Sequence, residues 1–275
     1  MRLIALAALV ALITLPVLAE TPLVQLQTGD ASRDWMAVGK LVIGEREFCT
    51  GAMVAPDLVL TAAHCLFDKD TGARFADNQI QFLDGWRNGR ANAYRGARAS
   101  VVLPGYTYGE PDQALRVSHD LALIALDQPI LLSQIPPFPM APAPDKDASV
   151  SVVSYAQDRS EAPSLQQTCH VIDRQQDMLV MNCDVDFGSS GAPVFVTGAD
   201  GAAIVSVISA KAEVDGKKVA LGSAIADPLP ILKAELEQIA PRRAGVKMLS
   251  GGSALNGGTG AKFVKVGQGA AAPGP

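Results

Sequence analysis

Three short segments of this sequence contain the residue types that hydrolysis by a serine nucleophile requires. Such chemistry needs an exposed serine hydroxyl, an imidazole that accepts its proton, and a carboxylate that keeps the imidazole in the productive tautomer. Backbone N–H groups must also face the oxygen on which negative charge develops. The sequence offers His64, Asp120 and Ser190 as candidates for these roles.

The neighbours of His64 and Asp120 suit these roles. His64 follows the small residues Ala62 and Ala63, which allow close backbone packing, and a bridged Cys65 would fix its base. Asp120 precedes the apolar run 121–126, which is consistent with a buried strand. A carboxylate at the mouth of such a strand is partly desolvated, which strengthens its hydrogen bond to an imidazolium.

Ser190 lies in the glycine-flanked turn Gly188-Ser189-Ser190-Gly191, which leads into an expected strand at 194–196. A glycine at 188 permits a backbone conformation that turns its own N–H and that of Ser190 toward one point. An oxyanion hole requires this arrangement. Ser189 is the rival nucleophile, and the Gly-x-Ser-Gly spacing favours Ser190.

These segments resemble the three sequence motifs of the trypsin/chymotrypsin-type serine proteases. Residues 61–65 match the histidine motif throughout, residues 119–123 match the aspartate motif closely, and residues 188–193 match the serine motif except at two positions. The order histidine, aspartate, serine is also that of the family, and the resemblance extends over roughly residues 35–239. The serine motif is most similar to the bacterial glutamyl-endopeptidase-like branch.

The resemblance implies that His64 is the general base, Asp120 its orienting acid and Ser190 the nucleophile, with the N–H groups of Gly188 and Ser190 as oxyanion donors. It implies an all-β, chymotrypsin-like fold of two antiparallel six-stranded β-barrels with a C-terminal helix. The implied activity is that of a serine endopeptidase acting on protein or peptide substrates, with no cofactor and no catalytic metal.

Two interpretations of specificity follow from the same resemblance. Asp184 stands six residues before Ser190, where in trypsin itself an acid at the base of the specificity pocket selects Arg or Lys. The alternative is a loop acid beside Cys183. The segment ending in Ser209 resembles the strand that walls the pocket and pairs with the substrate backbone, and Lys211 near its end would favour acidic side chains instead.

The sequence departs from many family members at Ser189, where they carry an aspartate. That aspartate pairs with a new amino terminus, created when the proenzyme is cut, and the pair forms the oxyanion hole. The sequence Arg-Ile-Val-Gly-Gly is also absent upstream. We therefore expect that catalytic readiness does not depend on a newly cut amino terminus.

Other candidate residues lack the required context. His119 directly precedes Asp120 and should point away from it on a strand, and His170 is interpreted as a surface or loop residue. An α/β-hydrolase esterase would need Gly-x-Ser-x-Gly on a strand-to-helix turn. Here Ala192 follows the second glycine and a strand is expected afterwards, so that class is disfavoured.

The first nineteen residues have the pattern of a secretory signal peptide, with cleavage expected after Ala19. Export to the periplasm or the medium would place the four cysteines in an oxidising compartment. They form two local pairs, so we expect the disulfides Cys49–Cys65 and Cys169–Cys183. The cysteines lack Cys-x-x-Cys spacing, which disfavours a zinc site.

Short apolar runs separated by Gly, Pro, Asp and Asn predict two series of strands. The predicted strands lie at 37–43, 48–54, 58–61, 80–83, 99–103 and 121–126, and then at 150–153, 169–172, 178–181, 193–196, 203–209 and 218–225. Ile231, Leu232, Leu236 and Ile239 are spaced as one face of a later helix. The predicted organisation is a signal peptide at 1–19, an irregular N-terminal segment at 20–34, a first barrel at 35–128, a proline-rich linker at 129–147, a second barrel at 148–228, a helix at 229–240 and a Gly/Ala-rich tail without fixed structure at 241–275.

The bulk composition limits the partners. A formal net charge of −5 without runs of like charge disfavours nucleic acid, and no later segment is long and apolar enough to anchor the chain in a membrane. Two alternatives to a freely active protease stay open. One is a protease-like binding protein that has lost turnover, motivated by Ser189, and the other is a protease whose cleft is occluded by residues 20–34 or by the tail.

Overall fold

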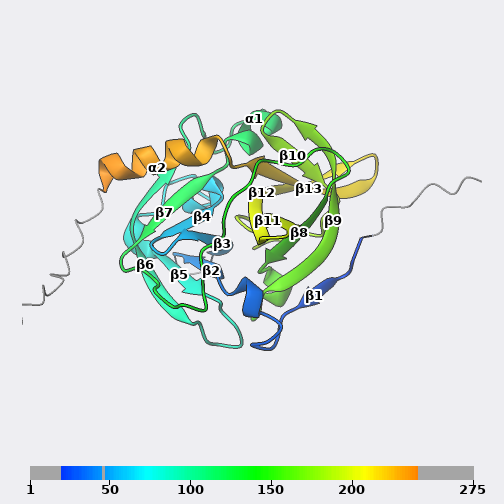
Figure 1. The fold of residues 1–275 in the computed structure, drawn as a ribbon. Coiled ribbons are helices and arrows are strands. Elements are labelled where there is room, and N and C mark those ends of the chain that lie inside the picture. Colours follow the sequence, from blue (N-terminus) through cyan, green and yellow to red (C-terminus); the bar gives the residue numbers. More distant parts are fainter. Residues whose placement is uncertain (1–19, 45–46, 241–275) are drawn as a thin grey trace, which may run out of the picture. The chain divides into compact units, whose positions relative to one another are not determined.

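The computed structural model describes residues 20–44 and 47–240. Within this range the strands form two antiparallel six-stranded barrels, which lie side by side in Figure 1. The predicted signal peptide and tail fall on residues 1–19 and 241–275, outside the described residues. None of the described helices is long and apolar enough to cross a membrane.

The first barrel closes in the order β2-β3-β4-β7-β6-β5. Its strands are β2 (Val38–Ile43), β3 (Glu47–Ala55), β4 (Leu58–Thr61), β5 (Ile80–Asp84), β6 (Ala93–Val102) and β7 (Ala122–Leu126). The register of β4 against β7 pairs Thr61 with Ala122. This pairing brings the residues that follow β4, His64 among them, beside Asp120, which precedes β7.

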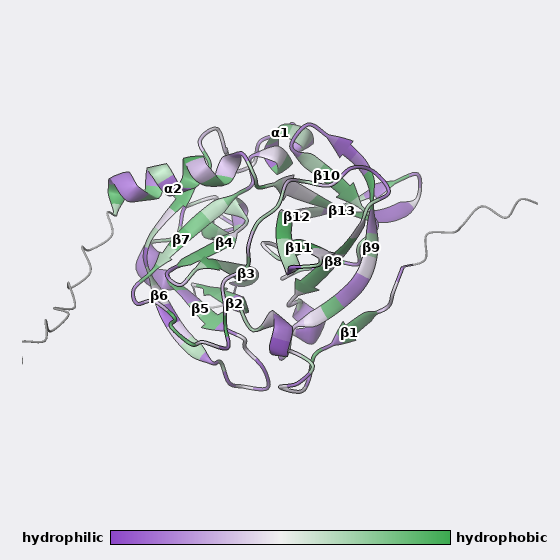
Figure 2. Ribbon diagram, in the orientation of Figure 1, coloured by the Kyte–Doolittle hydropathy of each residue, from purple (hydrophilic) through white to green (hydrophobic). Residues whose placement is uncertain are grey.

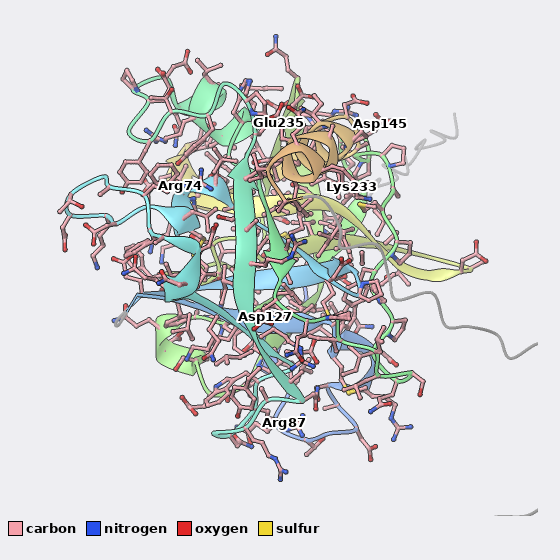
Figure 3. The ribbon with its side chains drawn as sticks, turned by 90° about the vertical axis from the view of Figure 1, so that its left-hand side faces the viewer. Arg74, Arg87, Asp127, Asp145, Lys233 and Glu235 are labelled. Carbon is pink, nitrogen blue, oxygen red and sulfur yellow. A yellow bond between two sulfur atoms is a disulfide. The ribbon has the colours of Figure 1, made fainter. Side chains whose placement is uncertain are left out.

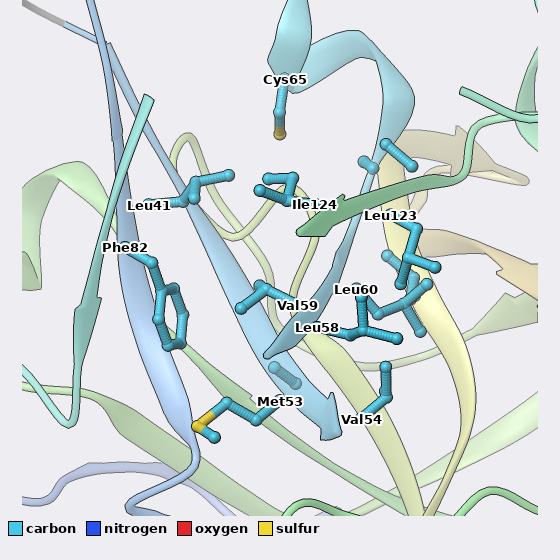
Figure 4. Packing of buried hydrophobic residues seen from close by; sticks show 14 of the residues in the cluster. Leu41, Met53, Val54, Leu58, Val59, Leu60, Cys65, Phe82, Leu123 and Ile124 are labelled. Atoms are coloured by element: carbon cyan, nitrogen blue, oxygen red, sulfur yellow. The ribbon is translucent and has the colours of Figure 1, made fainter. Parts of the chain in front are cut away.

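The interior of the first barrel explains why β4 and β7 are apolar along their whole length. Every residue of both strands is buried, and both are coloured as hydrophobic along most of their length in Figure 2. A continuous apolar run of this kind is typical of a strand buried on both faces. Side chains from several strands meet in this core in Figure 4, among them Leu41, Met53, Val59, Phe82 and Ile124.

The second barrel closes because β8 pairs with both β9 and β11. Its strands are β8 (Ser149–Ser154), β9 (Ser164–Gln175), β10 (Met178–Met181), β11 (Pro193–Gly198), β12 (Gly201–Val214) and β13 (Lys217–Ala224). All twelve predicted barrel strands are therefore present, with longer extents for several of them.

The N-terminal segment contains a strand that the sequence did not predict. β1 (Leu23–Gln25) pairs with Ser164–Gln166 of β9. β10 pairs only with the later part of β9, from Val171 onward. Without β1, the early part of β9 would present an unpaired edge of N–H and C=O groups, and this explains why a three-residue segment of weak strand pattern pairs there.

Two α-helices and four short 3₁₀ turns complete the described fold. The helices are α1 (Gln113–Ser118) and α2 (Pro228–Ile239), and the turns are η1 (Arg33–Trp35), η2 (Ala63–Leu66), η3 (Asp77–Gln79) and η4 (Gln157–Arg159). The side chain of Asp112 caps α1 by accepting hydrogen bonds from two backbone N–H groups of its first turn.

The predicted apolar face of the C-terminal helix is wrong in part. α2 packs on β6 and β7 through Leu229, Leu232 and Leu236. Ile231 and Ile239 are exposed by 48% and 60%. The buried stripe follows the spacing 229, 232, 236, which turns Ile231 to the side of the helix. Lys233 and Glu235, labelled in Figure 3, are partly exposed on the same helix.

The segment between the barrels carries only an isolated bridge, in which Met140 pairs with Ile204 of β12. Phe138 of this segment packs edge-on against Phe195 of β11, with ring centroids 4.7 Å apart. Trp35 contacts the same ring at 5.0 Å. Aromatic side chains from three distant parts of the chain therefore pack together, with Phe138 and Phe195 inside the largest hydrophobic cluster and Trp35 against it.

Candidate active site

His64 lies in η2, immediately after β4. A disulfide joins the next residue, Cys65, to Cys49 on β3, as predicted. The backbone of the turn is closed by the N–H of Phe67, which donates to the carbonyl of His64. The strand, the turn and the disulfide together hold the imidazole at one end of the first barrel.

Asp120 contacts His64 at two points. The ring Nδ1 of His64 lies 2.6 Å from Oδ2 of Asp120, and the backbone N–H of His64 donates to Oδ1 at 2.8 Å. The Asp120 side chain is 2% exposed, whereas that of His64 is 31% exposed. A buried carboxylate therefore fixes both the ring and the backbone of a histidine that still reaches the surface.

This contact also sets the protonation of His64. Burial acts to lower the pKa of the imidazole, but the negative charge of Asp120 and its hydrogen bond outweigh burial, and the pKa is raised above 6.5. The paired Asp120 carboxylate favours the imidazolium form. His64 is thus suited to accept a proton and to hold it while a reaction proceeds.

The carboxylate of Asp120 is itself supported from the second barrel. The hydroxyl of Ser209, on β12, donates to Oδ2 at 2.5 Å. The backbone N–H of Asp120 donates to Val117 of α1, and the hydroxyl of Ser223 on β13 donates to the same Val117 carbonyl. Ser209, predicted as a substrate-binding residue, is 8% exposed, and its hydroxyl contacts Asp120.

The turn that carries Ser190 depends on two glycines with positive φ. Gly188 has φ +96°, and a Cβ there would lie 2.4 Å from the Phe48 ring. Gly191 has φ +78°, and a Cβ there would lie 2.1 Å from Oγ1 of Thr61 and 2.2 Å from the carbonyl oxygen of Thr50. Both positions therefore require glycine for backbone conformation and for space.

Hydrogen bonds orient every peptide group of this turn. Its four successive carbonyls, from residue 187 to residue 190, all accept a hydrogen bond. The donors are the N–H of Gln157 to Phe187 at 2.8 Å, Oγ1 of Thr50 to Gly188 at 2.9 Å, the N–H of Ala192 to Ser189 at 2.9 Å and the N–H of Thr50 to Ser190 at 2.8 Å. Because the N–H of a peptide group points opposite to its carbonyl, these bonds also fix the N–H directions.

Two N–H groups of the turn remain available. Ser189 donates its N–H to Asp186 and Gly191 donates its N–H to Ile208, both at 2.8 Å. The N–H groups of Gly188 and Ser190 donate to no acceptor within residues 20–44 and 47–240. The sequence predicted these two N–H groups as oxyanion donors. Both can donate a hydrogen bond to a negatively charged oxygen.

Thr50 is a positioning residue that the sequence analysis missed. It is fully buried on β3 of the first barrel, yet it binds the Gly188 and Ser190 carbonyls of the second. Its Oγ1 also accepts the N–H of Tyr155 at 3.0 Å. In the sequence, only its position next to the predicted disulfide residue Cys49 points to Thr50. Contacts between the two barrels join residues far apart in the chain and leave no local pattern.

His64 and Ser190 line the same cleft, which has a volume of about 490 Å³. Gly188 and Ser209 also line it, and its apolar wall includes Phe48, Phe187 and Ile208. Residues 20–34, considered above as an occluding segment, are absent from its lining. The predicted base, nucleophile and oxyanion donors are thus brought to one surface.

Asp184 lines a different cavity. That cavity measures about 780 Å³, and residues 20–23 and Gln166 also line it. Val185, Asp186 and Lys211 border both the cleft and this cavity. Among them, Nζ of Lys211 lies 2.7 Å from Oδ1 of Asp186 and 4.1 Å from the centre of the Phe187 ring. A cation and its partner therefore border both the cleft that Ser190 lines and the cavity that Asp184 lines.

The remaining histidines and cysteines have structural roles. Nδ1 of His119 contacts the Leu115 carbonyl at the end of α1. The interpretation of His170 as a surface or loop residue is wrong, because it pairs with Ser149 inside β9 and is 3% exposed. Its strand is held by the second predicted disulfide, Cys169–Cys183.

Metal-ligand atoms cluster once among the described residues, at Cys49, His64 and Cys65. The two sulfurs of that group are joined in a disulfide, so neither is a thiolate ligand. The donor set does not fit a metal ion.

Comparisons with known proteins identify the family of this chain. The family model for the trypsin-like peptidase domain matches residues 49–204, more than half of the chain. Human serine protease 23 is 26% identical over 169 residues, which is 54% of this chain and 43% of that protein. Brachyurin of Leptuca pugilator is 29% identical over 99 residues, 36% of this chain and 39% of its own length.

The modular serine protease of Drosophila melanogaster is 32% identical over 89 residues, which is 32% of this chain and 14% of that protein. The chain therefore matches all three curated relatives over less than half of their own length. A solved structure of a Glu endopeptidase in complex with MPD matches the fold with a TM-score of 0.63. The match covers 78% of this chain and 95% of that one at 16% identity, which supports the fold and no more.

Proposed function

Since this chain belongs to the family of trypsin-like peptidases, we propose that it is an exported serine endopeptidase that hydrolyses peptide bonds through an acyl-enzyme on Ser190. The observation that carries this proposal is the paired contact of His64 with buried Asp120, in the cleft that Ser190 also lines. Asp120 is the orienting acid and His64 the general base.

In the acylation step, Oγ of Ser190 attacks the carbonyl carbon of the scissile peptide while His64 accepts the hydroxyl proton. The carbonyl oxygen becomes an oxyanion, and the N–H groups of Gly188 and Ser190 stabilise it. When the carbonyl re-forms, the C–N bond breaks and the leaving amine takes the proton from His64. An ester between the substrate acyl group and Ser190 remains.

In the deacylation step, a water molecule attacks the ester while His64 accepts its proton. The same two N–H groups stabilise the second oxyanion. The ester C–O bond then breaks, and His64 returns the proton to Ser190. Asp120 stabilises the imidazolium in both steps and keeps Nδ1 of His64 as the protonated nitrogen.

Hydrolysis by a Ser190→Ala variant tests this function directly. Wild-type protein should hydrolyse casein or a mixed peptide library, and Ser190→Ala should reduce the rate by at least about 1,000-fold with an unchanged melting temperature. Ser133→Ala, at an exposed serine between the barrels, is the matched control and should retain full activity. Wild-type protein without hydrolytic activity would favour the protease-like binding protein instead.

Export is the second part of the proposal. It rests on the pattern of residues 1–19 and on the two disulfides, which form in oxidising compartments. Expression of the full chain in a secreting host, followed by N-terminal sequencing of the exported protein, should give Glu20 as the first residue. Protein that stays in the cytoplasm at full length would contradict this part and leave the chemistry untouched.

We propose that substrate lies along the end of β12, beside Ser209 and Lys211. Both residues line the cleft with Ser190, and the exposed Lys211 ammonium is held there by its pairing with Asp186. This position favours acidic substrate side chains over basic ones. The name of the structural neighbour, a Glu endopeptidase, agrees with such a preference.

A further inference from the structure

The segment Tyr155–Arg159 contacts the turn that carries Ser190. The backbone N–H of Gln157 donates to the Phe187 carbonyl and thereby orients the peptide whose N–H belongs to Gly188. A Cβ on Gly188 would also lie 3.1 Å from the Cα of Ala156. One of the two oxyanion donors therefore depends on where η4 (Gln157–Arg159) sits.

Arg159 is the side chain that joins η4 to the turn. It is 12% exposed, and its Nη2 lies 3.5 Å from Oγ of both Ser154 and Ser189. Its Nη1 pairs with the exposed Asp158 at 3.0 Å. This partly buried guanidinium therefore lies next to the residue that precedes the nucleophile.

The Ser189 hydroxyl is the centre of these contacts. It is 1% exposed and lies 3.3 Å from Oγ of Ser154 and 3.4 Å from the carbonyl oxygen of Tyr155. The N–H of Asp186 lies 3.3 Å from the same oxygen. Each distance is long for a hydrogen bond, so none of these contacts alone fixes the Ser189 side chain. The Arg159 guanidinium packs against this group from the side of η4.

We propose that Arg159 is a positioning residue that holds η4 against Ser189, so that the oxyanion hole forms without an aspartate at 189 and without a newly cut amino terminus. The inference rests on the proposed peptidase function and concerns how its site is kept ready. The permanent charge of arginine suits this role, because no pH change within the working range of the enzyme removes it.

Replacement of Arg159 should affect the transition state more than substrate binding. For Arg159→Met, which keeps much of the apolar stem, we expect kcat to fall by about 100-fold, similar to the loss of one oxyanion donor, with KM changed by less than about threefold. Affinity for a peptide boronate, which forms a tetrahedral adduct, should fall in parallel. Affinity for the product peptide should stay unchanged, and Arg159→Lys should recover part of kcat.

Arg74 provides a matched control. Its Nη2 donates to the carbonyl and the hydroxyl of Ser100 in the first barrel, and the residue is labelled in Figure 3. Arg74→Met should lower the melting temperature without changing kcat or boronate affinity. If the wild type is active and the folded Arg159→Met variant has the same kcat, the inference is wrong. If the wild type itself is inactive, the proposed function is wrong.

A second variant decides the case if Arg159→Met does not fold. Ser189→Asp buries a carboxylate beside Arg159, which should pair with it and keep kcat/KM within about threefold of wild type. Loss of activity in Ser189→Asp with Arg159 intact contradicts the inference.

Discussion

Asp120 binds His64 through both of its carboxylate oxygens, one to the ring Nδ1 and one to the backbone N–H. The first contact fixes the tautomer of the imidazole and the second fixes the backbone from which it extends. Because Asp120 is almost fully buried, the negative charge acts on the histidine with little screening by water.

The pH dependence of activity should follow the protonation of His64. Its pKa is raised by the charge and hydrogen bond of Asp120, and only the neutral imidazole can accept the Ser190 proton. We therefore expect kcat/KM to rise with pH through an apparent pKa above 6.5. In Asp120→Asn this limb should move to lower pH, and kcat should fall by about 10,000-fold. If kcat/KM rises at the same pH in the wild type and in Asp120→Asn, Asp120 does not control the pKa of His64.

Gly191→Ala should prevent the turn from folding. The substitution places a methyl group 2.1 Å from Oγ1 of Thr61 at a φ of +78°, so the protein should lose at least about 3 kcal/mol of stability and its activity. Thermal unfolding followed by circular dichroism measures this loss. Gly198→Ala, at the end of β11 with no atom within 4 Å of its Cβ, is the control and should unfold like the wild type.

The ion pair between Lys211 and Asp186 should set the charge preference of the substrate. Lys211→Ala should lower kcat/KM for substrates with Glu before the scissile bond relative to those with Arg by about tenfold, because the removed cation borders the cleft. Lys233→Ala on α2 should leave this ratio unchanged. A peptide-library cleavage profile measures both.

Asp184→Asn tests the competing assignment of specificity. Asp184 lines the cavity behind Lys211 and does not line the cleft, so the substitution should leave the cleavage profile of the wild type unaltered. A wild type that cleaves after Arg or Lys, with that preference lost in Asp184→Asn, would instead place Asp184 at the base of the specificity pocket.

Asp84 should make the folded protein less stable as pH rises. Its carboxyl is fully buried on β5, and burial raises its pKa to about 7, with only partial opposition from nearby Asn92 and Arg95. In the unfolded chain its pKa is near 3.8, so the folded state resists ionisation between about pH 4 and 7 and loses stability across that range. Asp84→Asn should be more stable by up to about 4 kcal/mol above pH 7 and equal to wild type near pH 4. Equal urea midpoints at both pH values would contradict this prediction.

The sequence predicted the parts of the fold and site that leave a local pattern. The twelve barrel strands have apolar runs bounded by turn residues, and both disulfides join cysteines fourteen or sixteen residues apart. The segments around His64, Asp120 and Ser190 are equally local, since small residues, a buried strand and flanking glycines are visible in the chain itself.

What the sequence did not predict depends on contacts between distant residues. β1 exists because β9 has an edge to cover, and Thr50 and Arg159 matter because the turn of Ser190 packs between them. α1 is a helix of six residues capped by Asp112, too short for a periodic pattern. The burial of His170 is set by neighbouring strands. Apart from the cap of α1 and the place of Thr50 next to Cys49, these features have no signature within a few residues of sequence.

Labelling with a fluorophosphonate tests the central claim most directly, because the reagent reacts with a serine that a neighbouring base has activated. The phosphorus–fluorine bond breaks, fluoride leaves and a phosphonyl ester forms on the attacking oxygen. Mass spectrometry of the digested wild-type protein should find one adduct, on Ser190, and none in Ser190→Ala or in heat-unfolded protein. No adduct on folded wild type, or an adduct on Ser189, would contradict the account.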